Sequence, residues 1–194
     1  MLTQIIVGAL LLCLFYSIYI VKMLLLKKQG ISVDLLGKGD KPEKAARIEI
    51  ILKLITYIGA VIQFISVFFS NFILLFNTSF PIHTIGIFLM TVGVSFFLLS
   101  VTVMRNNWRA GFDKKQNTKL VTNGIYKISR NPAFVGFDLL YIGCMLAFPN
   151  IFNATITLIA IVAFHVQILG EEKFLIENFG QEYLDYKSKV RRYF

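Results

Sequence analysis

The chain has 194 residues, of which 56% are hydrophobic and 16% charged, and its formal net charge is +9. This composition excludes a soluble globular domain, because the apolar residues are grouped into runs of about 20, the length that crosses a bilayer core of about 30 Å. Two cysteines within apolar runs and two isolated histidines give no disulfide framework and no metal-ligand spacing. The sequence therefore predicts an all-α integral membrane protein without a metal site.

Five apolar runs are expected to cross the membrane as helices. The first lacks a basic leader and a cleavage site, so it is predicted to be a retained helix and not a signal peptide. The fourth is short for a crossing, so the hairpin that it forms with the fifth is either tilted or partly re-entrant. The predicted spans are residues 2–26, 48–76, 82–104, 134–148 and 151–169.

The polar residues of the first half have local explanations. Residues 27–47 are rich in Gly and Lys and are expected to form a solvated cytoplasmic linker. Glu49 and Lys53 have the i,i+4 spacing of an interfacial helix pair. Gln63 is expected to form a hydrogen bond between helices.

The cations predict the orientation of the chain in the membrane. All 20 Lys and Arg residues fall in three loops and their flanks, from Lys22 to Lys53, from Arg105 to Arg130 and from Lys173 to Arg192. By the positive-inside rule these segments are cytoplasmic, so the amino terminus is outside and the carboxyl terminus is in the cytoplasm. The net charge of +9 then reflects orientation and attraction to an anionic inner leaflet, and it requires no nucleic-acid partner.

A polar turn, Arg130-Asn131-Pro132, opens the fourth span. Proline at the first turn of a helix loses no needed hydrogen bond, so Pro132 is a helix-start signal, and Asn131 has the side chain of a helix cap. An arginine beside a membrane-buried turn needs an anionic partner. For Arg130 this partner is either a bound ligand or a bilayer phosphate.

Two adjacent carboxylates, Glu171 and Glu172, follow the fifth span and are expected at the inner end of its helix. Neighbouring helical residues point about 100° apart, so the two acids cannot face the same partner. A cationic ligand in a partly dry site would attract one of them, whereas the alternative is a solvated interfacial turn.

The tail from Glu171 to Lys189 is amphipathic, with aromatic residues at helical spacing. Gly180 interrupts it, which favours two short helices. They either lie on the membrane surface or fold as a lid over a ligand, in which case Tyr183 and Tyr186 are the candidate contacts.

Three further residues are candidates for chemistry. Asp138 lies inside the fourth span near its cytoplasmic mouth, where an ionisable residue either lines a site or pairs with another span. His165 is more typical of helix packing. Arg109, beside the interfacial residue Trp108, lies in a basic loop that suits an anionic headgroup or carboxylate.

Together these motifs resemble the isoprenylcysteine carboxyl methyltransferase family and the related phospholipid methyltransferases. The family pattern runs Leu-Val-x-x-Gly-x-Tyr, Arg-His-Pro-x-Tyr-x-Gly, an apolar hairpin, Glu-Glu, and Phe-Gly-x-Glu-Tyr-x-x-Tyr. The matching positions are Leu120, Val121, Gly124 and Tyr126, then Arg130, Pro132 and Gly136, then Glu171 and Glu172, then Phe179, Gly180, Glu182, Tyr183 and Tyr186. Asn131 replaces the usual His, so a proton-transfer role at that position is lost, and Phe134 replaces a Tyr, which removes a hydroxyl.

The resemblance implies that S-adenosylmethionine binds at the cytoplasmic mouth of the last two spans, beneath the tail. The implied cofactor contacts are Tyr126, Arg130, Asn131, Pro132, Gly136, Glu171, Glu172, Tyr183 and Tyr186. The catalytic candidates are Arg109, Arg130 and Asp138. Residues 105–194 would form the methyltransferase core, and residues 1–104 would add the first three spans.

The implied reaction is carboxyl O-methylation of an isoprenylcysteine-like or other lipophilic acceptor. A carboxylate acceptor needs only a cation to orient it, and Arg109 or Arg130 is the expected one. Methylation of a phospholipid or small-lipid amine is the alternative, and it would need a base such as Asp138, His165 or a glutamate. A non-catalytic membrane protein that retains the fold is a further alternative.

Overall fold

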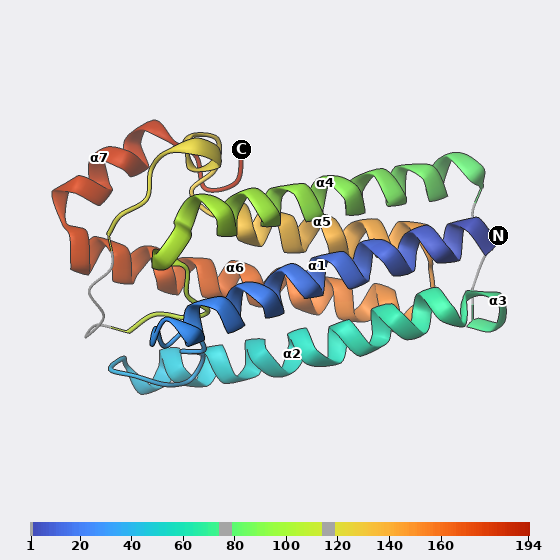
Figure 1. Ribbon diagram of the computed structural model, residues 1–194, viewed down its shortest axis with the longest axis horizontal. Helices are drawn as coiled ribbons and strands as arrows, with labels where there is room; N and C mark the ends of the chain where they lie inside the picture. The colour runs from blue at the N-terminus through green and yellow to red at the C-terminus, as the bar shows by residue number, and fades with distance from the viewer. Residues whose placement is uncertain (1, 74–78, 114–118) are drawn as a thin grey trace.

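The computed structural model describes residues 2–73, 79–113 and 119–194, and the named elements in these ranges are all helices (Figure 1). The long apolar helices are α1 (Leu2–Lys28), α2 (Glu43–Phe68), α4 (Phe80–Met104) and α6 (Ile151–Phe179), each of sufficient length to cross a membrane. The shorter elements are α3 (Ser70–Ile73), η1 (Arg105–Asn107), η2 (Gly124–Lys127), α5 (Pro132–Ala147) and α7 (Gln181–Lys189). The predicted all-α membrane bundle is confirmed, although the expected end of the second span at Phe76 lies outside the described residues.

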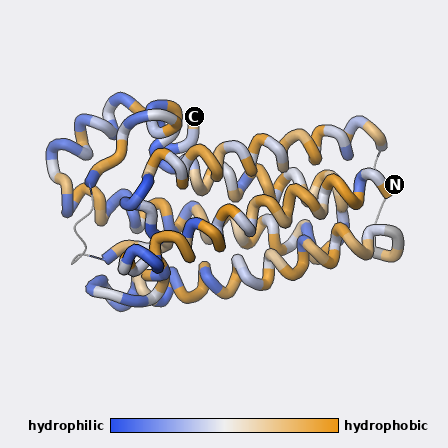
Figure 2. Tube along the Cα trace, viewed as in Figure 1, coloured by the Kyte–Doolittle hydropathy of each residue, from blue (hydrophilic) through white to orange (hydrophobic). Residues whose placement is uncertain are grey.

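The two ends of the bundle differ in polarity. The linker after α1, the loops before α5 and helix α7 gather at one end, whereas the amino terminus and α3 lie at the other (Figure 1). Hydrophobic residues dominate the length of the helices between the two ends, and hydrophilic ones gather at the α7 end (Figure 2). The cationic loops therefore lie together at one end of the bundle, as the positive-inside rule requires of loops on one side of a membrane.

Local signals set the helix boundaries. Proline occupies the first turns of α4 and α5, where its missing N–H has no intrahelical role. Asn150 caps α6, because its Oδ1 accepts a hydrogen bond from the backbone N–H of Asn153 at 2.9 Å. Gly180, at φ +52°, separates α6 from α7, as expected. The prediction of two short tail helices is wrong, since α6 runs unbroken through Glu171 and Glu172, which therefore do not lie at a helix end.

Helices α4 and α5 pack through paired glycines. A Cβ placed on Gly93 would lie 2.7 Å from the carbonyl oxygen of Gly136, and one placed on Gly143 would lie 2.6 Å from that of Gly86. Only hydrogen at these positions lets the two backbones approach so closely, which is a common way for membrane helices to associate. The glycines therefore fix the spacing and register of α5 against α4.

The turn between α5 and α6 reaches the far end of the bundle. Asn150 Nδ2 donates a hydrogen bond of 2.8 Å to Ser66 Oγ, near the end of α2. The ring of Phe148 contacts His83, near the start of α4, with 5.5 Å between centroids. Because α5 has 16 residues, or about 24 Å of helix, it extends from the loop end almost to the opposite end. This geometry favours a crossing over a re-entrant hairpin.

Aromatic packing fills the middle of the bundle. Phe15 stacks on Phe97 with 4.5 Å between centroids and meets the edge of Phe137 at 4.8 Å. The hydroxyl of Tyr16 donates a 2.7 Å hydrogen bond to Gln63 Oε1, which confirms the expected link between helices at Gln63. These contacts join α1 and α2 to the later helices in one bundle.

The linker and the Glu49–Lys53 pair differ from the prediction. Val33 and Leu35 are buried, and both bond to the loop after α4: the Leu35 N–H donates to the Ala110 carbonyl, and the Ala110 N–H donates to the Val33 carbonyl. Much of the linker therefore folds back onto the bundle instead of lying in solvent. Glu49 is fully buried and pairs with Lys41, whereas Lys53 pairs with Asp34. The i,i+4 rule failed here because partners from the folded linker are closer and shield the carboxylate from water.

The glycine seam generates a test of the fold. Gly93→Ala would place a methyl group 2.7 and 2.8 Å from backbone atoms of α5, which cannot move aside as a side chain can. We expect the free energy of unfolding in detergent to fall by about 1–3 kcal/mol. The matched control is Gly170→Ala in α6, where a Cβ has no neighbour within 4 Å and the change should be neutral or stabilise by up to about 1 kcal/mol. Equal stability of the two variants would contradict the packing argument.

Candidate functional site

A cavity of about 590 Å³ lies at the loop end of the bundle and extends between the helices. Its volume falls within the range of about 300–1,000 Å³ that is typical of small-molecule sites. The part between the helices is apolar and aromatic, and it includes Tyr16, Tyr19, Tyr57, Phe97, Phe137 and Phe164. The part at the loop end is polar, and it includes Arg109, Lys119, Arg130, Asn131, Gln167, Glu171 and Tyr183. The cavity therefore suits an amphipathic ligand, or a polar and an apolar ligand together.

The two adjacent glutamates on α6 have different surroundings. Glu171 lines the cavity, and its Oε1 accepts a 3.0 Å hydrogen bond from Gln167 Nε2. No ion pair to it is formed by the described residues of the chain. Glu172, about 100° away around the helix, is not among the lining residues. Only Glu171 is placed to contact a ligand in the cavity.

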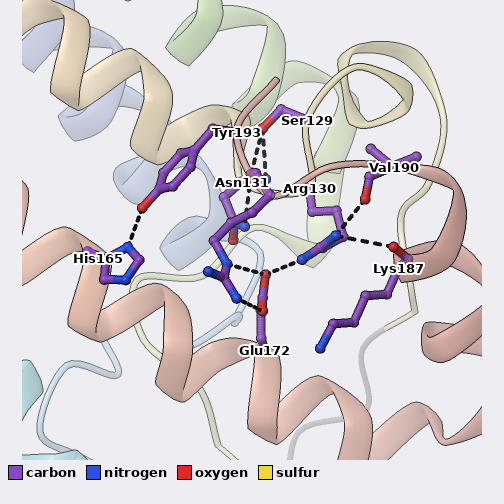
Figure 3. A network of polar contacts seen from close by, with 9 residues as sticks. Ser129, Arg130, Asn131, His165, Glu172, Lys187, Val190 and Tyr193 are labelled. Carbon is purple, nitrogen blue, oxygen red and sulfur yellow. Dashed lines mark hydrogen bonds and ion pairs between the residues drawn. The ribbon is translucent and has the colours of Figure 1, made fainter.

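Glu172 is the centre of an ion-pair network (Figure 3). Its Oε1 accepts hydrogen bonds from Arg130 Nη2 at 2.6 Å and from Arg192 Nε at 3.0 Å, and its Oε2 accepts one from Arg192 Nη2 at 2.9 Å. The carboxylate is almost fully buried, so charge neutralisation by two guanidinium groups offsets its desolvation. These contacts join α6, the turn before α5 and the last residues of the chain.

Residues 190–194, here called the C-terminal strap, lie against the turn that opens α5 (Figure 3). The Arg130 N–H donates to the carbonyl of Arg191 at 3.0 Å, and Ser129 Oγ donates to the carbonyl of Arg192 at 3.1 Å. Tyr193 Oη lies 2.6 Å from His165 Nδ1, which gives His165 a hydrogen-bond partner as expected for a packing residue. The strap thus holds α7 and the turn together.

The predicted turn Arg130-Asn131-Pro132 lines the cavity. The Arg130 guanidinium is already engaged, since it also donates to the backbone carbonyls of Lys187 and Val190. Asn131 donates through Nδ2 to the Arg192 carbonyl at 3.3 Å, so the amide that replaces the family's usual His anchors the strap. The turn therefore connects the cavity wall to the ion-pair network.

Helix α7 covers the cavity with two buried tyrosines. Tyr183 and Tyr186 both line it, and the Tyr186 hydroxyl donates a 2.6 Å hydrogen bond to the carbonyl of Tyr126, another lining residue. Burial, together with the nearby Glu172, raises the pKa of Tyr183 to about 12, so its phenol remains protonated at neutral pH. Of the two predicted placements of the tail, the structure shows the lid.

Arg109 also lines the cavity, and its Nη1 donates 2.7 Å hydrogen bonds to the carbonyls of Asn106 and Trp108. Gly136 and Asp138 do not line it. Gly136 lies at the α4–α5 crossing, where its predicted cofactor contact is replaced by helix packing. The Oδ1 atom of Asp138 is buried and has no hydrogen-bond partner in the described part of the chain. The pKa of Tyr193 is raised chiefly by burial and further by the nearby carboxylate of Asp138.

Sequence reasoning missed several lining residues. Gln167 is four residues before Glu171 on the same helix face, and a polar residue inside an apolar run was the signal that could have identified it. Tyr16, Tyr19 and Tyr57 come from the first two spans, which carried no motif. Their contribution depends on how α1 and α2 pack against the later helices.

The fold and cavity define a multi-pass, all-helical membrane protein with an amphipathic cavity at one end of its bundle. The sequence model of the phospholipid methyltransferase family matches residues 81–182, just over half of the 194-residue chain. The chain belongs to this family.

Curated relatives extend the comparison. The protein-S-isoprenylcysteine O-methyltransferase of Saccharomyces cerevisiae is 38% identical over 78 residues, which are 40% of this chain and 33% of that protein. Protein-S-isoprenylcysteine O-methyltransferase B of Arabidopsis thaliana is 31% identical over 78 residues, covering 40% of each. The protein-S-isoprenylcysteine O-methyltransferase of Mus musculus is 34% identical over 79 residues, which are 40% of this chain and 28% of that protein. The matches therefore span well under half of these relatives.

The ion-pair network generates a stability prediction. Glu172→Gln keeps the size of the side chain but leaves Arg130 and Arg192 without their anion. We expect the free energy of unfolding in detergent to fall by about 1–3 kcal/mol, less than for a fully buried pair because the Arg192 side chain is 31% exposed. Asp185→Asn, at an exposed pair with Gln181 on α7, is the control and should change stability by under about 0.5 kcal/mol. If both variants melt like the parent protein, Glu172 does not anchor the strap.

Proposed function

We propose that this chain is an S-adenosylmethionine-dependent membrane methyltransferase acting on the carboxyl group of an isoprenylcysteine-like or other lipophilic acceptor. Its similarity to protein-S-isoprenylcysteine O-methyltransferases and its place in the phospholipid methyltransferase family support this function. The observation that carries the proposal is the position of Glu171, a carboxylate without a described ion-pair partner, in an amphipathic cavity beneath Tyr183 and Tyr186.

The residues present fit S-adenosylmethionine. Glu171 offers a negative charge to a cationic group. The hydroxyl of Tyr183 is buried in the cavity wall, and it forms no hydrogen bond of normal geometry with any described residue. A bound ligand with polar edges would satisfy this group. When bound, this cofactor supplies a methyl group activated by a positively charged sulfur.

The chain would then act chiefly by positioning and by excluding water. We assign direct contacts with the cofactor to the lining residues of the predicted set, which are Tyr126, Arg130, Asn131, Pro132, Glu171, Tyr183 and Tyr186. Glu172 would act indirectly, because it holds Arg130 and the strap in place. Gly136 would set the position of α5 through its contact with Gly93.

The positions of the candidate bases favour an acceptor carboxylate. Asp138 and His165 are not among the residues that line the cavity, whereas Arg109 is. A carboxylate is deprotonated at neutral pH and needs only orientation, which the Arg109 guanidinium can provide. The apolar part of the cavity between α1, α2 and α5 would hold the lipid portion.

The rival function is N-methylation of a phospholipid or small lipid, which the description of the matching family favours. An amine must arrive deprotonated, and Glu171 is the cavity-lining member of the predicted bases. In either case we propose that the amino terminus is outside, that the carboxyl terminus is cytoplasmic, and that residues 105–194 form the methyltransferase core.

Cofactor binding can be tested at Glu171. We expect Glu171→Gln to raise the dissociation constant for S-adenosylmethionine by about tenfold or more, because a charge-assisted contact is lost, and to leave the melting temperature nearly unchanged. Calorimetry on detergent-purified protein measures both. Glu182→Gln, at an exposed position of α7, serves as the control. Unchanged affinity in Glu171→Gln would remove that carboxylate from the cofactor site.

The acceptor can be tested with a labelled methyl donor. We expect incubation of the protein with donor and total membrane extract to give a labelled lipophilic product from which base releases volatile label, since methyl esters hydrolyse in base. Base-stable label would instead indicate an amine or thioether product and favour the rival function. Protein that binds the donor but labels no product in any membrane extract would support the non-catalytic alternative.

A further inference from the structure

A second buried carboxylate, Glu49 on α2, lies behind the cavity wall. It is fully buried, and both of its oxygens are occupied. Its Oε2 accepts hydrogen bonds from Lys41 Nζ at 2.5 Å and from the Gly37 N–H at 2.8 Å. Its Oε1 accepts longer ones from the Phe112 N–H at 3.3 Å and from Gln167 Nε2 at 3.4 Å. One side chain thus connects the linker, the loop after α4 and helix α6.

The cation that neutralises Glu49 is as deeply buried. The Lys41 side chain is 1% exposed, donates to the Leu35 carbonyl at 2.9 Å, and places its ammonium 4.8 Å from the centre of the Phe112 ring. A buried ion pair loses so much hydration that an apolar pair of similar size is often as stable. The pair is therefore better explained by the geometry that it imposes than by a gain in stability.

The segments held by Glu49 form part of the cavity wall. Leu35, Gly111 and Phe112 line the cavity, and Phe112 stacks on Phe174 of α6 with 4.6 Å between ring centroids. Gly111 has φ +85°, and a Cβ there would lie 3.0 Å from Glu49 Oε1. A glycine at this position meets both the backbone conformation and the close approach of the carboxylate.

Gln167 connects Glu49 to Glu171. Its Nε2 donates to Glu49 Oε1 at 3.4 Å and to Glu171 Oε1 at 3.0 Å. An amide nitrogen has two hydrogens and no acceptor, so two carboxylates on its nitrogen side fix which way the amide faces. Rotation of the amide would bring its oxygen against both anions. The buried acid therefore determines the orientation of the group that holds the cavity acid.

We propose that Glu49 is a positioning residue for Glu171, acting through Gln167, and that α2 thereby contributes to the cofactor site without touching the cofactor. This inference rests on the proposed function. It assigns a role to a residue outside the region 81–182 that matches the family. It also explains why an acid in a span without a recognised motif is completely buried.

The test is a double-mutant cycle on cofactor affinity. Dissociation constants for S-adenosylmethionine are measured by calorimetry on the 194-residue protein in detergent for the parent, Glu49→Gln, Glu171→Gln and the double variant. We expect Glu49→Gln alone to weaken binding by about tenfold, and to weaken it by less than about twofold when Glu171 is already Gln. A general structural defect would instead lower affinity by the same factor in both backgrounds.

Two further variants make the result decisive. Glu43→Gln, at an exposed pair with Arg47 on the same helix, should leave affinity unchanged. Gln167→Leu cuts the link but leaves the contacts of Glu49 with Lys41, and it replaces Glu49→Gln in the cycle if that variant does not fold. Parent protein that fails to bind the cofactor refutes the proposed function and this inference with it. If the parent protein binds the cofactor, two results refute the positioning role alone. In one, Glu49→Gln leaves the affinity unchanged, and in the other it lowers the affinity by the same factor whether residue 171 is Glu or Gln.

Discussion

The ion pairs of Glu172 with Arg130 and Arg192 fix the arrangement on which the cavity depends. They connect α6 to the turn that starts α5 and to the C-terminal strap, so the lid helix α7 is held at both of its ends. Burying these charges is unfavourable unless each one is paired or hydrogen-bonded. Arg130 meets this condition in part through its hydrogen bonds to the carbonyls of Lys187 and Val190. Because Glu172 is turned toward this network, its neighbour Glu171 is turned toward the cavity.

The cavity combines two environments that suit different parts of a membrane reaction. Its polar end lies with the loops and α7, whereas its apolar end extends between helices that also expose many large hydrophobic side chains. An acceptor with a lipid tail could keep that tail in apolar surroundings while its polar group meets the polar end. The same geometry separates Asp138 and His165 from the site and associates His165 with the strap instead.

Buried charge occurs twice near this end, and the two clusters support different walls. Glu172 organises the side formed by α5 and the strap, and Glu49 organises the side formed by the linker and the loop after α4. Gln167 and Glu171 lie on α6 between the two clusters. We infer that the polar end of the cavity is rigid for this reason, since each wall is tied to α6 by hydrogen bonds to a charged group.

Hydropathy by itself located the apolar helices, because each apolar run must satisfy its backbone internally in a bilayer. Among the residues that the structure describes, four of these helices are long enough to cross a membrane, and the remaining predicted span is the shorter helix α5. Spacing also identified Pro132 and Gly180 as helix boundaries, and the motif order identified the family. Local rules failed wherever a residue's partner was distant in sequence. Glu49 matched a surface pair with Lys53, but its partners come from three other segments, and a contact of that range has no local pattern. The sequence predicted that the side chains of the adjacent glutamates point in different directions. Only the packed bundle decided that Glu171 faces the cavity and Glu172 faces the two arginines, because tertiary contacts set the rotation of a helix about its axis.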